Sequence, residues 1–307
     1  MIKRLLLAVM LVASMTATAK ETIKILIPFA AGGPSDMLGR AVEQSLIKNL
    51  PEYKPVIEYK PGAGGLIGIR AVAANKENET QLIVLSSAII IHSVRPDAGY
   101  NLKRDFVPVA YLGEQEFSLV TNKKGPATLK ELLTADKNKE LFFGSAGIGS
   151  GSHIAGEIFK MNTGLPLTHV PYKGEAPAIT DLIAGNINLM FTSTGTASKY
   201  SDSLRILATN GSKKNTALTN VPTLQELGVK GFDNPVQLSL VYANSTANPA
   251  LIKKIQIALI KSLNDPVDVV AYNNAGVEVN TKKITRFDDI VDSALIRIRP
   301  LADKLQQ

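Results

Sequence analysis

Glycine and serine gather in short segments whose composition suits the binding of a small anion. The segments are AAGGPSD (30–36), KPGAGGLIG (60–68), GSAGIGSGSH (144–153), YKGEAP (172–177) and TSTGTA (192–197). Glycine lets the backbone approach a ligand closely, and the N–H groups that begin a helix attract negative charge. One such loop is most simply a tight turn. Several in one chain favour a binding site for an anion.

These loops do not match the motifs that bind nucleotides or activate a nucleophile. No G-x-x-x-x-G-K-[ST] string occurs, so the sequence has no P-loop. In GAGGLIG (62–68) and GIGSGS (147–152), Ile67 and Ser152 replace the third glycine of G-x-G-x-x-G. No serine stands in a G-x-S-x-G string, so hydrolysis through a nucleophile elbow is unsupported.

Histidine and acidic residues offer little catalytic equipment. The chain has three histidines, His92, His153 and His169, and no cysteine. None of them forms H-E-x-x-H or a close pair, so we expect no metal site and no cofactor. His153 begins a predicted helix, where it either contacts a ligand or packs against its own helix. His169 lies in a predicted strand and is more simply a core or interdomain residue.

Short apolar runs alternate with amphipathic segments along most of the chain. Strands are predicted at 22–27, 56–59, 81–86, 117–121, 141–145, 168–171, 187–193, 204–210 and 236–243. Helices are predicted at 36–50, 67–74, 128–135, 152–162, 175–184, 195–200, 249–263, 266–275 and 287–305. This alternation predicts α/β domains with mainly parallel sheets. In such sheets the ligand crevice lies beyond the carboxyl ends of the strands, where the glycine-rich loops fall.

Helix starts carry capping signals. Ser35 and Asp36 are suited to cap the helix that follows them, and Thr128 with Glu131 fits a capping box. Asp36 is an acid beside an expected anion site. We therefore expect its carboxylate to cap its own helix or to bond the neighbouring loop rather than to face the ligand.

The first nineteen residues predict a secretory signal peptide. Lys3 and Arg4 precede an apolar run from Leu5 to Met15, and Ala17-Thr18-Ala19 forms an A-x-A cleavage site. The run is too short to span a bilayer as a helix. We therefore expect cleavage after about Ala19 and an exported chain from about Lys20 to Gln307.

The composition limits the classes of molecule that the chain is expected to bind. Without residues 1–19 the chain loses two basic residues and no acid, so its formal net charge falls from +7 to +5. The lysines are scattered and only 6% of residues are aromatic, which argues against nucleic-acid binding. Without cysteine there are no disulfides, so the fold must rest on its core. The length is sufficient for two domains.

The glycine-rich loops lie within longer strings that resemble a known family. IPFAAGGPSDMLGRAV, YKPGAGGLIGIRAVA, FGSAGIGSGSHIAGEIFK, HVPYKGEAPAITDLIAGNINLMF and VPTLQELGVKGF follow one another between about residues 23 and 232. In these strings the chain resembles the periplasmic solute-binding proteins of tripartite tricarboxylate transporters, the Bug or TctC-like family. The fourth string is highly specific.

The resemblance implies an α/β, two-domain periplasmic-binding-protein fold of a type II-like kind. Each domain would have a mainly parallel sheet flanked by helices, with the ligand cleft between the domains. It also implies a monomeric periplasmic receptor, not an enzyme, with no nucleic-acid partner. The receptor would capture a small organic carboxylate and deliver it to a membrane permease with one large and one small subunit.

The resemblance also places the ligand site. In the family, the first strand–helix loop and the loop that opens the central helix close on a ligand carboxylate, largely through main-chain N–H groups and ordered water. The site residues implied here are Phe29, Ala30, Gly32, Gly33, Pro34, Ser35, Asp36, Ser86, Ser87, Ser145, Ala146, Gly147, Gly149, Ser150, Ser152, His153, Tyr172, Lys173, Gly174, Thr192, Ser193, Thr194 and Gly195. Two segments depart from the family pattern: SSAIIIHSVRPDAG (86–99), which contains His92, and the stretch after Phe232.

The chain is expected to cross between domains near Thr121 to Lys124 and near Pro235 to Val241. After the signal peptide (1–19), residues 20–121 and 240–307 would form one domain and residues 122–239 the other. Two other functions stay open at this point. One is an exported ligand sensor for a membrane kinase, and the other is an exported hydrolase acting on carboxylic acids or esters.

Overall fold

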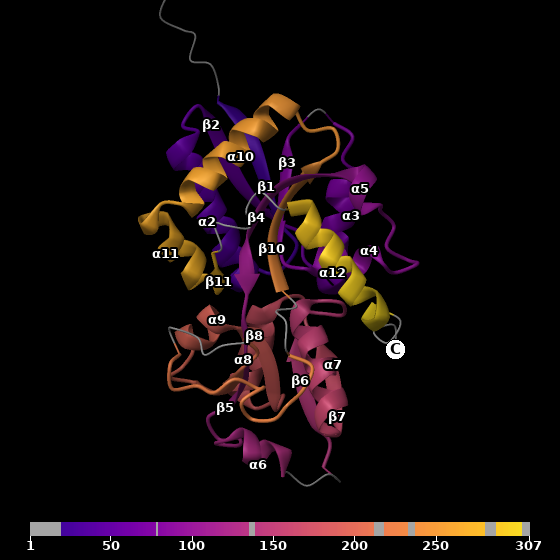
Figure 1. The fold of residues 1–307 in the computed structure, drawn as a ribbon, viewed down its shortest axis with the longest axis vertical. Coiled ribbons are helices and arrows are strands. Elements are labelled where there is room, and N and C mark those ends of the chain that lie inside the picture. Colours follow the sequence, from indigo (N-terminus) through magenta and orange to yellow (C-terminus); the bar gives the residue numbers. More distant parts are fainter. Residues whose placement is uncertain are drawn as a thin grey trace, which may run out of the picture.

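The protein folds into two stacked units, each built on one β-sheet (Figure 1). The computed structural model describes residues 20–77, 79–134, 139–211, 218–232, 237–279 and 287–302. The predicted signal peptide lies outside these residues. No helix within them combines the length and the apolar character needed to cross a membrane.

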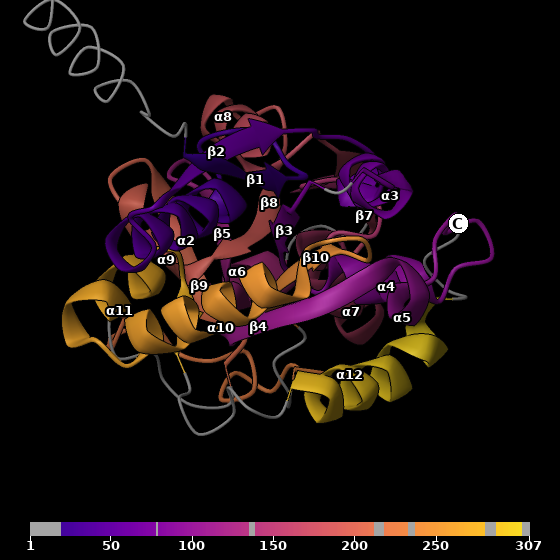
Figure 2. The same ribbon diagram turned by 90° about the horizontal axis from the view of Figure 1, so that it is seen from above.

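The first sheet has the strand order β11-β4-β10-β3-β1-β2. Its strands are β1 (Glu21–Ile27), β2 (Tyr53–Tyr59), β3 (Gln81–Leu85), β4 (Phe106–Gln115), β10 (Gln237–Asn244) and β11 (Val277–Glu278). β1 runs parallel to β2 and β3, whereas β10 runs antiparallel to β3 and β4. Helices cover both faces (Figures 1 and 2): α2 (Pro34–Asn49), α10 (Pro249–Leu263) and α11 (Pro266–Asn274) on one, and α3 (Leu66–Ala74), α4 (Ala88–Ser93), α5 (Leu102–Asp105) and α12 (Phe287–Ala302) on the other.

The second sheet has the order β7-β6-β8-β5-β9. Its strands are β5 (Phe117–Asn122), β6 (Leu141–Ser145), β7 (Leu167–Pro171), β8 (Leu189–Ser193) and β9 (Leu204–Thr209). β6 is parallel to β7 and β8, and β5 is antiparallel to β8 and β9. Its helices are α6 (Leu129–Leu133), α7 (Gly151–Thr163), α8 (Glu175–Ala184) and α9 (Thr194–Lys199).

The two sheets repeat one plan. In each, a parallel block of three strands is joined by one antiparallel strand, β10 or β5, that adjoins a passage between the units. Among the described strands, four of six in the first sheet and four of five in the second run in one direction. The predicted α/β fold class is confirmed.

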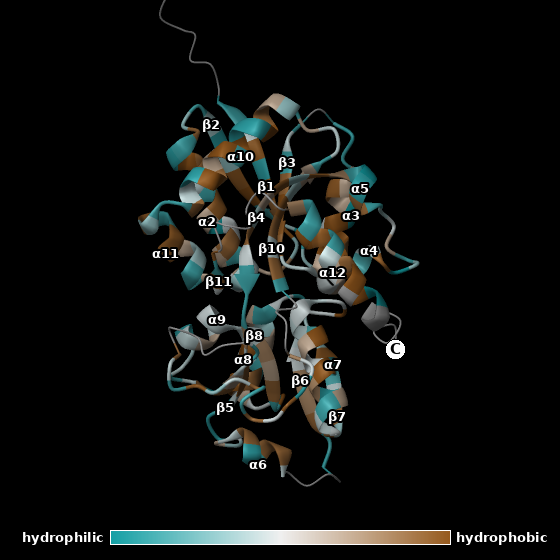
Figure 3. Cartoon of the chain, viewed as in Figure 1, coloured by the Kyte–Doolittle hydropathy of each residue, from teal (hydrophilic) through white to brown (hydrophobic). Residues whose placement is uncertain are grey.

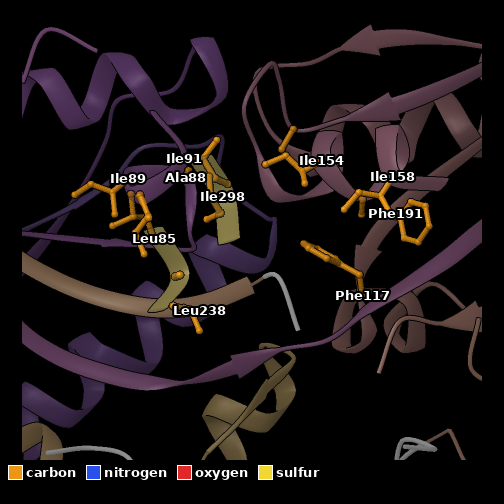
Figure 4. Packing of buried hydrophobic residues seen from close by; sticks show 14 of the residues in the cluster. Leu85, Ala88, Ile89, Ile91, Phe117, Ile154, Ile158, Phe191, Leu238 and Ile298 are labelled. Carbon is orange, nitrogen blue, oxygen red and sulfur yellow. The ribbon is translucent and has the colours of Figure 1, made fainter. Parts of the chain in front are cut away.

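Alternation of buried side chains explains the layers. In β3, Leu82 and Val84 pack on one face while Ile83 and Leu85 pack on the other, as the two-residue period of a strand requires. Apolar residues accordingly concentrate where helices meet the sheets (Figure 3). One cluster contains residues of both units, among them Leu238 of the first sheet and Phe117 and Phe191 of the second (Figure 4). The units therefore share a core beside the cleft.

One long strand, β4, was not predicted from the sequence. Its segment FVPVAYLGEQ contains Pro108, which lacks an N–H donor, and Gly113, which has a positive φ of 148°. Two register irregularities in the pairing with β10, beside Leu240 and Tyr242, let the strand continue past both residues. The short helices α4 and α5 were not predicted either.

The chain passes between the two sheets twice. The chain leaves the first sheet at β4 and enters the second at β5, with Glu116 between them, earlier than Thr121. It returns between β9 and β10, and Pro235 lies outside the described residues. The division into domains at 20–121, 122–239 and 240–307 stays a proposal, with β5 pairing in the second sheet.

Candidate ligand-binding site

A cleft of about 360 Å³, including space open to solvent, lies where the loops of the two units meet. The loops after β1 and β6 supply most of its wall, together with residues on either side of the passage from β4 to β5. It is lined by Phe29, Ala30, Gly33, Pro34, Ser35, Ser86, Gln115, Phe117, Ala146, Ser150, Gly151, Ser152 and Glu175. Nine of these thirteen residues are among the predicted site residues.

The first loop is held by the carboxylate of Asp36. This side chain is only 5% exposed, and its Oδ2 accepts a 2.8 Å hydrogen bond from the N–H of Gly32. The Tyr59 hydroxyl donates to Oδ1 at 2.7 Å, and the Nε of Arg40 lies 3.0 Å from the same oxygen. Of the two expected roles, bonding of the neighbouring loop is confirmed by the contact with Gly32. The carboxylate is thus occupied away from the cleft, to which Asp36 contributes no lining.

The helix that follows this loop presents an uncapped start to the cleft. α2 begins at Pro34, and its N-cap Gly33 provides no side-chain cap. The predicted cap by Ser35 and Asp36 was therefore wrong, because proline at the first helical position starts the helix earlier. Within the described part of the chain, the N–H of Ser35 has no hydrogen-bond acceptor. This donor, with the positive end of α2 behind it, is suited to an anion.

The second loop is held by serine hydroxyls. Ser145 Oγ accepts from the N–H of Gly147 at 3.0 Å, and Ser152 Oγ accepts from that of Ala146 at 3.0 Å. Ser150 caps α7 by accepting from the N–H of His153 at 3.3 Å. These hydroxyls, predicted as ligand contacts, fix the shape of the loop.

The start of α7 faces the cleft as the start of α2 does. Gly151 and Ser152 both line it, and neither N–H has an acceptor among the described residues. The two helix starts therefore bring their uncompensated donors to one cavity.

All three histidines surround the second loop. His153 Nδ1 accepts from the N–H of Gly149 at 3.2 Å, and its ring stacks on His169 with 3.9 Å between ring centroids. His92 packs against the other side of Gly149, where an added Cβ would lie 2.4 Å from its ring. Burial lowers the pKa of His92 and His153 to about 4 and that of His169 to about 3. All three rings are therefore neutral at pH 7, and none lines the cleft.

Backbone contacts join the two units on both sides of the cleft. The N–H of Ala30 donates to the carbonyl of Lys173 at 3.1 Å, so this amide is already used within the protein. On the other side, Gly64 packs so tightly on the second loop that a Cβ there would lie 1.9 Å from the Ile148 carbonyl oxygen. The structure is therefore a closed arrangement of the two units.

The remaining predicted residues do not line the cleft. The Thr192 hydroxyl donates to Glu175 Oε2 at 2.5 Å, and Ser193 Oγ caps α9 by accepting from the N–H of Thr196. Ser87 Oγ accepts from the N–H of Leu238 at 2.8 Å. The predicted residues that do not line the cleft are Gly32, Asp36, Ser87, Ser145, Gly147, Gly149, His153, Tyr172, Lys173, Gly174, Thr192, Ser193, Thr194 and Gly195.

Four lining residues were missed: Gln115, Phe117, Gly151 and Glu175. Gly151 lies inside the GSGSH string and could have been included from its position alone. Gln115 ends β4 and Phe117 begins β5, so both depended on recognising the passage between the units. The sequence did not indicate Glu175, because an acidic side chain is not expected beside an anion site.

One pair has a geometry that enzymes use, but it lies outside the cleft. Ser145 Oγ is 2.6 Å from His169 Nε2, the distance of a nucleophile and its base. Ser145 is fully buried and does not line the cavity. The pair therefore has a structural role in the second loop. In the described residues, no group of three His, Asp or Glu side chains is placed to hold a metal ion.

Comparison with known proteins fits this architecture. The family model described as the tripartite tricarboxylate transporter family receptor matches residues 38–306. The chain belongs to this family. Protein BugT of Bordetella pertussis is 31% identical over 218 residues, which cover 68% of this chain and 67% of that protein.

Solved structures of similar proteins share the fold of this chain. The periplasmic binding protein BugD superposes with a TM-score of 0.84 and 26% identity, covering 94% of this chain and 98% of that one. A Rhodopseudomonas palustris protein solved with adipate gives a TM-score of 0.85 and 24% identity, with the same coverage. The fold is thus that of the periplasmic binding proteins.

Proposed function

We propose that this chain is a periplasmic receptor that captures a small organic carboxylate between its two units. It then delivers the acid to a membrane permease with one large and one small subunit. The observation that carries the proposal is the meeting of two helix starts at one cleft. The N–H groups of Ser35, Gly151 and Ser152 line or border that cleft and have no acceptor among the described residues.

The energetics of such a site are sufficient without a basic side chain. Each N–H that bonds a carboxylate contributes about 1.5–3 kcal/mol. The field at each helix start adds about 0.3–1 kcal/mol. Micromolar affinity needs about 8 kcal/mol. A few such bonds therefore suffice, less the cost of bringing the units together.

Membership of the receptor family and the neighbour solved with adipate support a carboxylate as the ligand class. The predicted signal peptide supports export to the periplasm, with cleavage after about Ala19. We expect the receptor to act as a monomer. The expected motion is hinge closure about the two passages between the units, one of them at Glu116.

The test is calorimetry and thermal shift on residues 20–307 with mono-, di- and tricarboxylates, amino acids and aromatic acids. We expect saturable binding at one site per chain, with the acid recovered unchanged. Chemical conversion of a bound acid would favour the hydrolase alternative. Silence across the whole panel would contradict the proposal.

A further inference from the structure

Glu175 places an acceptor in a cleft whose other polar groups include the donors of two helix starts. It is the first residue of α8, it is 8% exposed, and it lines the cleft. It packs beside the first loop, because a Cβ placed on Gly33 would be 3.8 Å from the Cβ of Glu175. A ligand anchored at the start of α2 therefore reaches this side chain.

The carboxylate of Glu175 is positioned by the strand behind it. The Thr192 hydroxyl donates to Oε2 at 2.5 Å, and the N–H of Ser193 donates as well. Both donors favour the charged carboxylate. Burial opposes it and raises the pKa of Glu175 to about 7.

The described lining of the cleft supplies no cation to balance Glu175. None of the lining residues is lysine, arginine or histidine. Lys173, on the segment just before α8, is exposed, and Asp36 on α2 is engaged with Gly32, Tyr59 and Arg40. A second carboxylate placed here would therefore face a buried acid with no compensating charge.

We propose that Glu175 selects acids that carry a hydrogen-bond donor, an amide N–H or an ammonium group, in addition to the anchored carboxylate. This inference rests on the proposed function, because it assumes a carboxylate held at the starts of α2 and α7. An amino acid of this kind brings one negative group to the helix starts and one positive group to Glu175. An unsubstituted dicarboxylate brings its second negative charge to Glu175.

The test compares ligands of equal length that differ only at one end. Succinate, glutarate and adipate are titrated beside their monoamides and the ω-amino acids of matching chain length, using residues 20–307 at pH 8. The wild type is expected to bind the amide or ammonium member at least about tenfold more tightly than the dicarboxylate. Glu175→Gln is expected to reduce that ratio to about threefold or less, since a glutamine amide both donates and accepts.

Each other outcome has a defined meaning. Equal or tighter binding of the dicarboxylates by the wild type overturns the inference and leaves the proposed function standing. Uptake of one proton when a dicarboxylate binds, measured from the binding heats in two buffers, also overturns the inference. A protonated Glu175 would then donate a hydrogen bond to the second carboxylate. If no acid of this series binds while another acid of the panel does, the inference fails and the proposed function stands. If no acid binds at all, the inference and the proposed function both fail. The wild-type ratio needs no variant, so the inference is testable even if Glu175→Gln does not fold.

Discussion

The loops after β1 and β6 occupy equivalent places in the two sheets, yet they are held in different ways. The first is tied by one carboxylate, Asp36, which bonds Gly32 and meets the partly exposed Arg40 and Tyr59. The second is tied by serine hydroxyls and is surrounded by three neutral histidines, of which His92 and His153 are buried. Both end in a helix start that faces the cleft. Both loops thus present the N–H groups of a helix start to the cleft. One loop is held by a charged carboxylate, and the other by neutral hydroxyl and imidazole groups.

The difference teaches where each loop is vulnerable. Room around the first loop is generous, since a Cβ on Gly33 would meet nothing closer than 3.8 Å. The second loop is packed from all sides, and a Cβ on Gly151 would lie 1.8 Å from the amide nitrogen of the fully buried Gln237. An added methyl group or a low pH should therefore disturb the second loop. Loss of the Asp36 charge should disturb the first.

The largest effect is expected from an added methyl group at the two helix starts. Gly151→Ala should weaken acid binding by more than about 100-fold, or about 3 kcal/mol, because Gln237 cannot leave its buried site freely. Gly33→Ala, the matched control, should change affinity by less than about threefold, since its φ of −92° suits any residue. Calorimetry with the tightest acid of the panel measures both. Equal losses in the two variants would contradict the contrast.

Acid should destabilise the protein through the second loop. His169 has its pKa lowered to about 3, so the stability it contributes is complete above its ordinary 6.5 and is lost as the pH falls toward 3. At pH 5 the loss is about 2 kcal/mol relative to pH 7. Urea unfolding at both pH values should show that loss shrinking in His169→Asn.

Glu175 provides the control of opposite sign. Its pKa is raised to about 7, so the stability it contributes is complete below its ordinary 4.5 and is lost as the pH rises through 7. Glu175→Gln should therefore gain stability over the wild type as the pH rises from 5 to 8. If the free energy of unfolding changed equally with pH in the wild type and in His169→Asn, the protonation of His169 would not be linked to unfolding.

Removing the charged tie of the first loop should have a smaller effect. Asp36→Ala releases the Gly32 N–H, leaves the Tyr59 hydroxyl without its acceptor and removes the ion pair with Arg40, so acid binding should weaken at least about tenfold. Asp36→Asn keeps one acceptor oxygen and should fall between the wild type and Asp36→Ala. Unchanged affinity together with unchanged stability in Asp36→Ala would remove the role assigned to this carboxylate.

The smallest effect concerns the two helix caps. Ser150→Ala removes the side-chain cap of α7 and should lower the free energy of unfolding by about 1 kcal/mol. Ser35→Ala removes no cap from α2 and should stay within about 0.5 kcal/mol. Urea unfolding of both variants measures the difference. A larger loss in Ser35→Ala than in Ser150→Ala would mean that the caps are assigned to the wrong helix.

Much of the cleft could be predicted because glycine and serine at strand ends carry a local signal. Phe29 to Ser35 and Ala146 to Ser152 follow β1 and β6 directly, and each stretch contributes to the lining. The family resemblance fixed their order. It did not fix the direction of the hydroxyls, and Ser145 and Ser152 turn toward backbone N–H groups of their own loop.

Other features depend on contacts between distant segments and carry no such signal. β4 continues past Pro108 and Gly113 only because its pairing with β10 is irregular there. Glu175 lines the cleft while its carboxylate bonds Thr192 of β8, a contact between separate segments of the chain. His92 and His153 contact Gly149 and His169 stacks on His153, so this group joins residues from separate stretches of the chain. Composition and spacing along the chain do not encode these meetings.

The central claim is that one carboxylate is held by the starts of α2 and α7. The most direct measurement is a crystal structure of residues 20–307 with the tightest acid of the panel. We expect the carboxylate oxygens to lie within hydrogen-bond distance of the N–H of Ser35 on one side and of Gly151 or Ser152 on the other. A carboxylate bound instead to a lysine or arginine side chain, with these N–H groups facing water, would contradict the account.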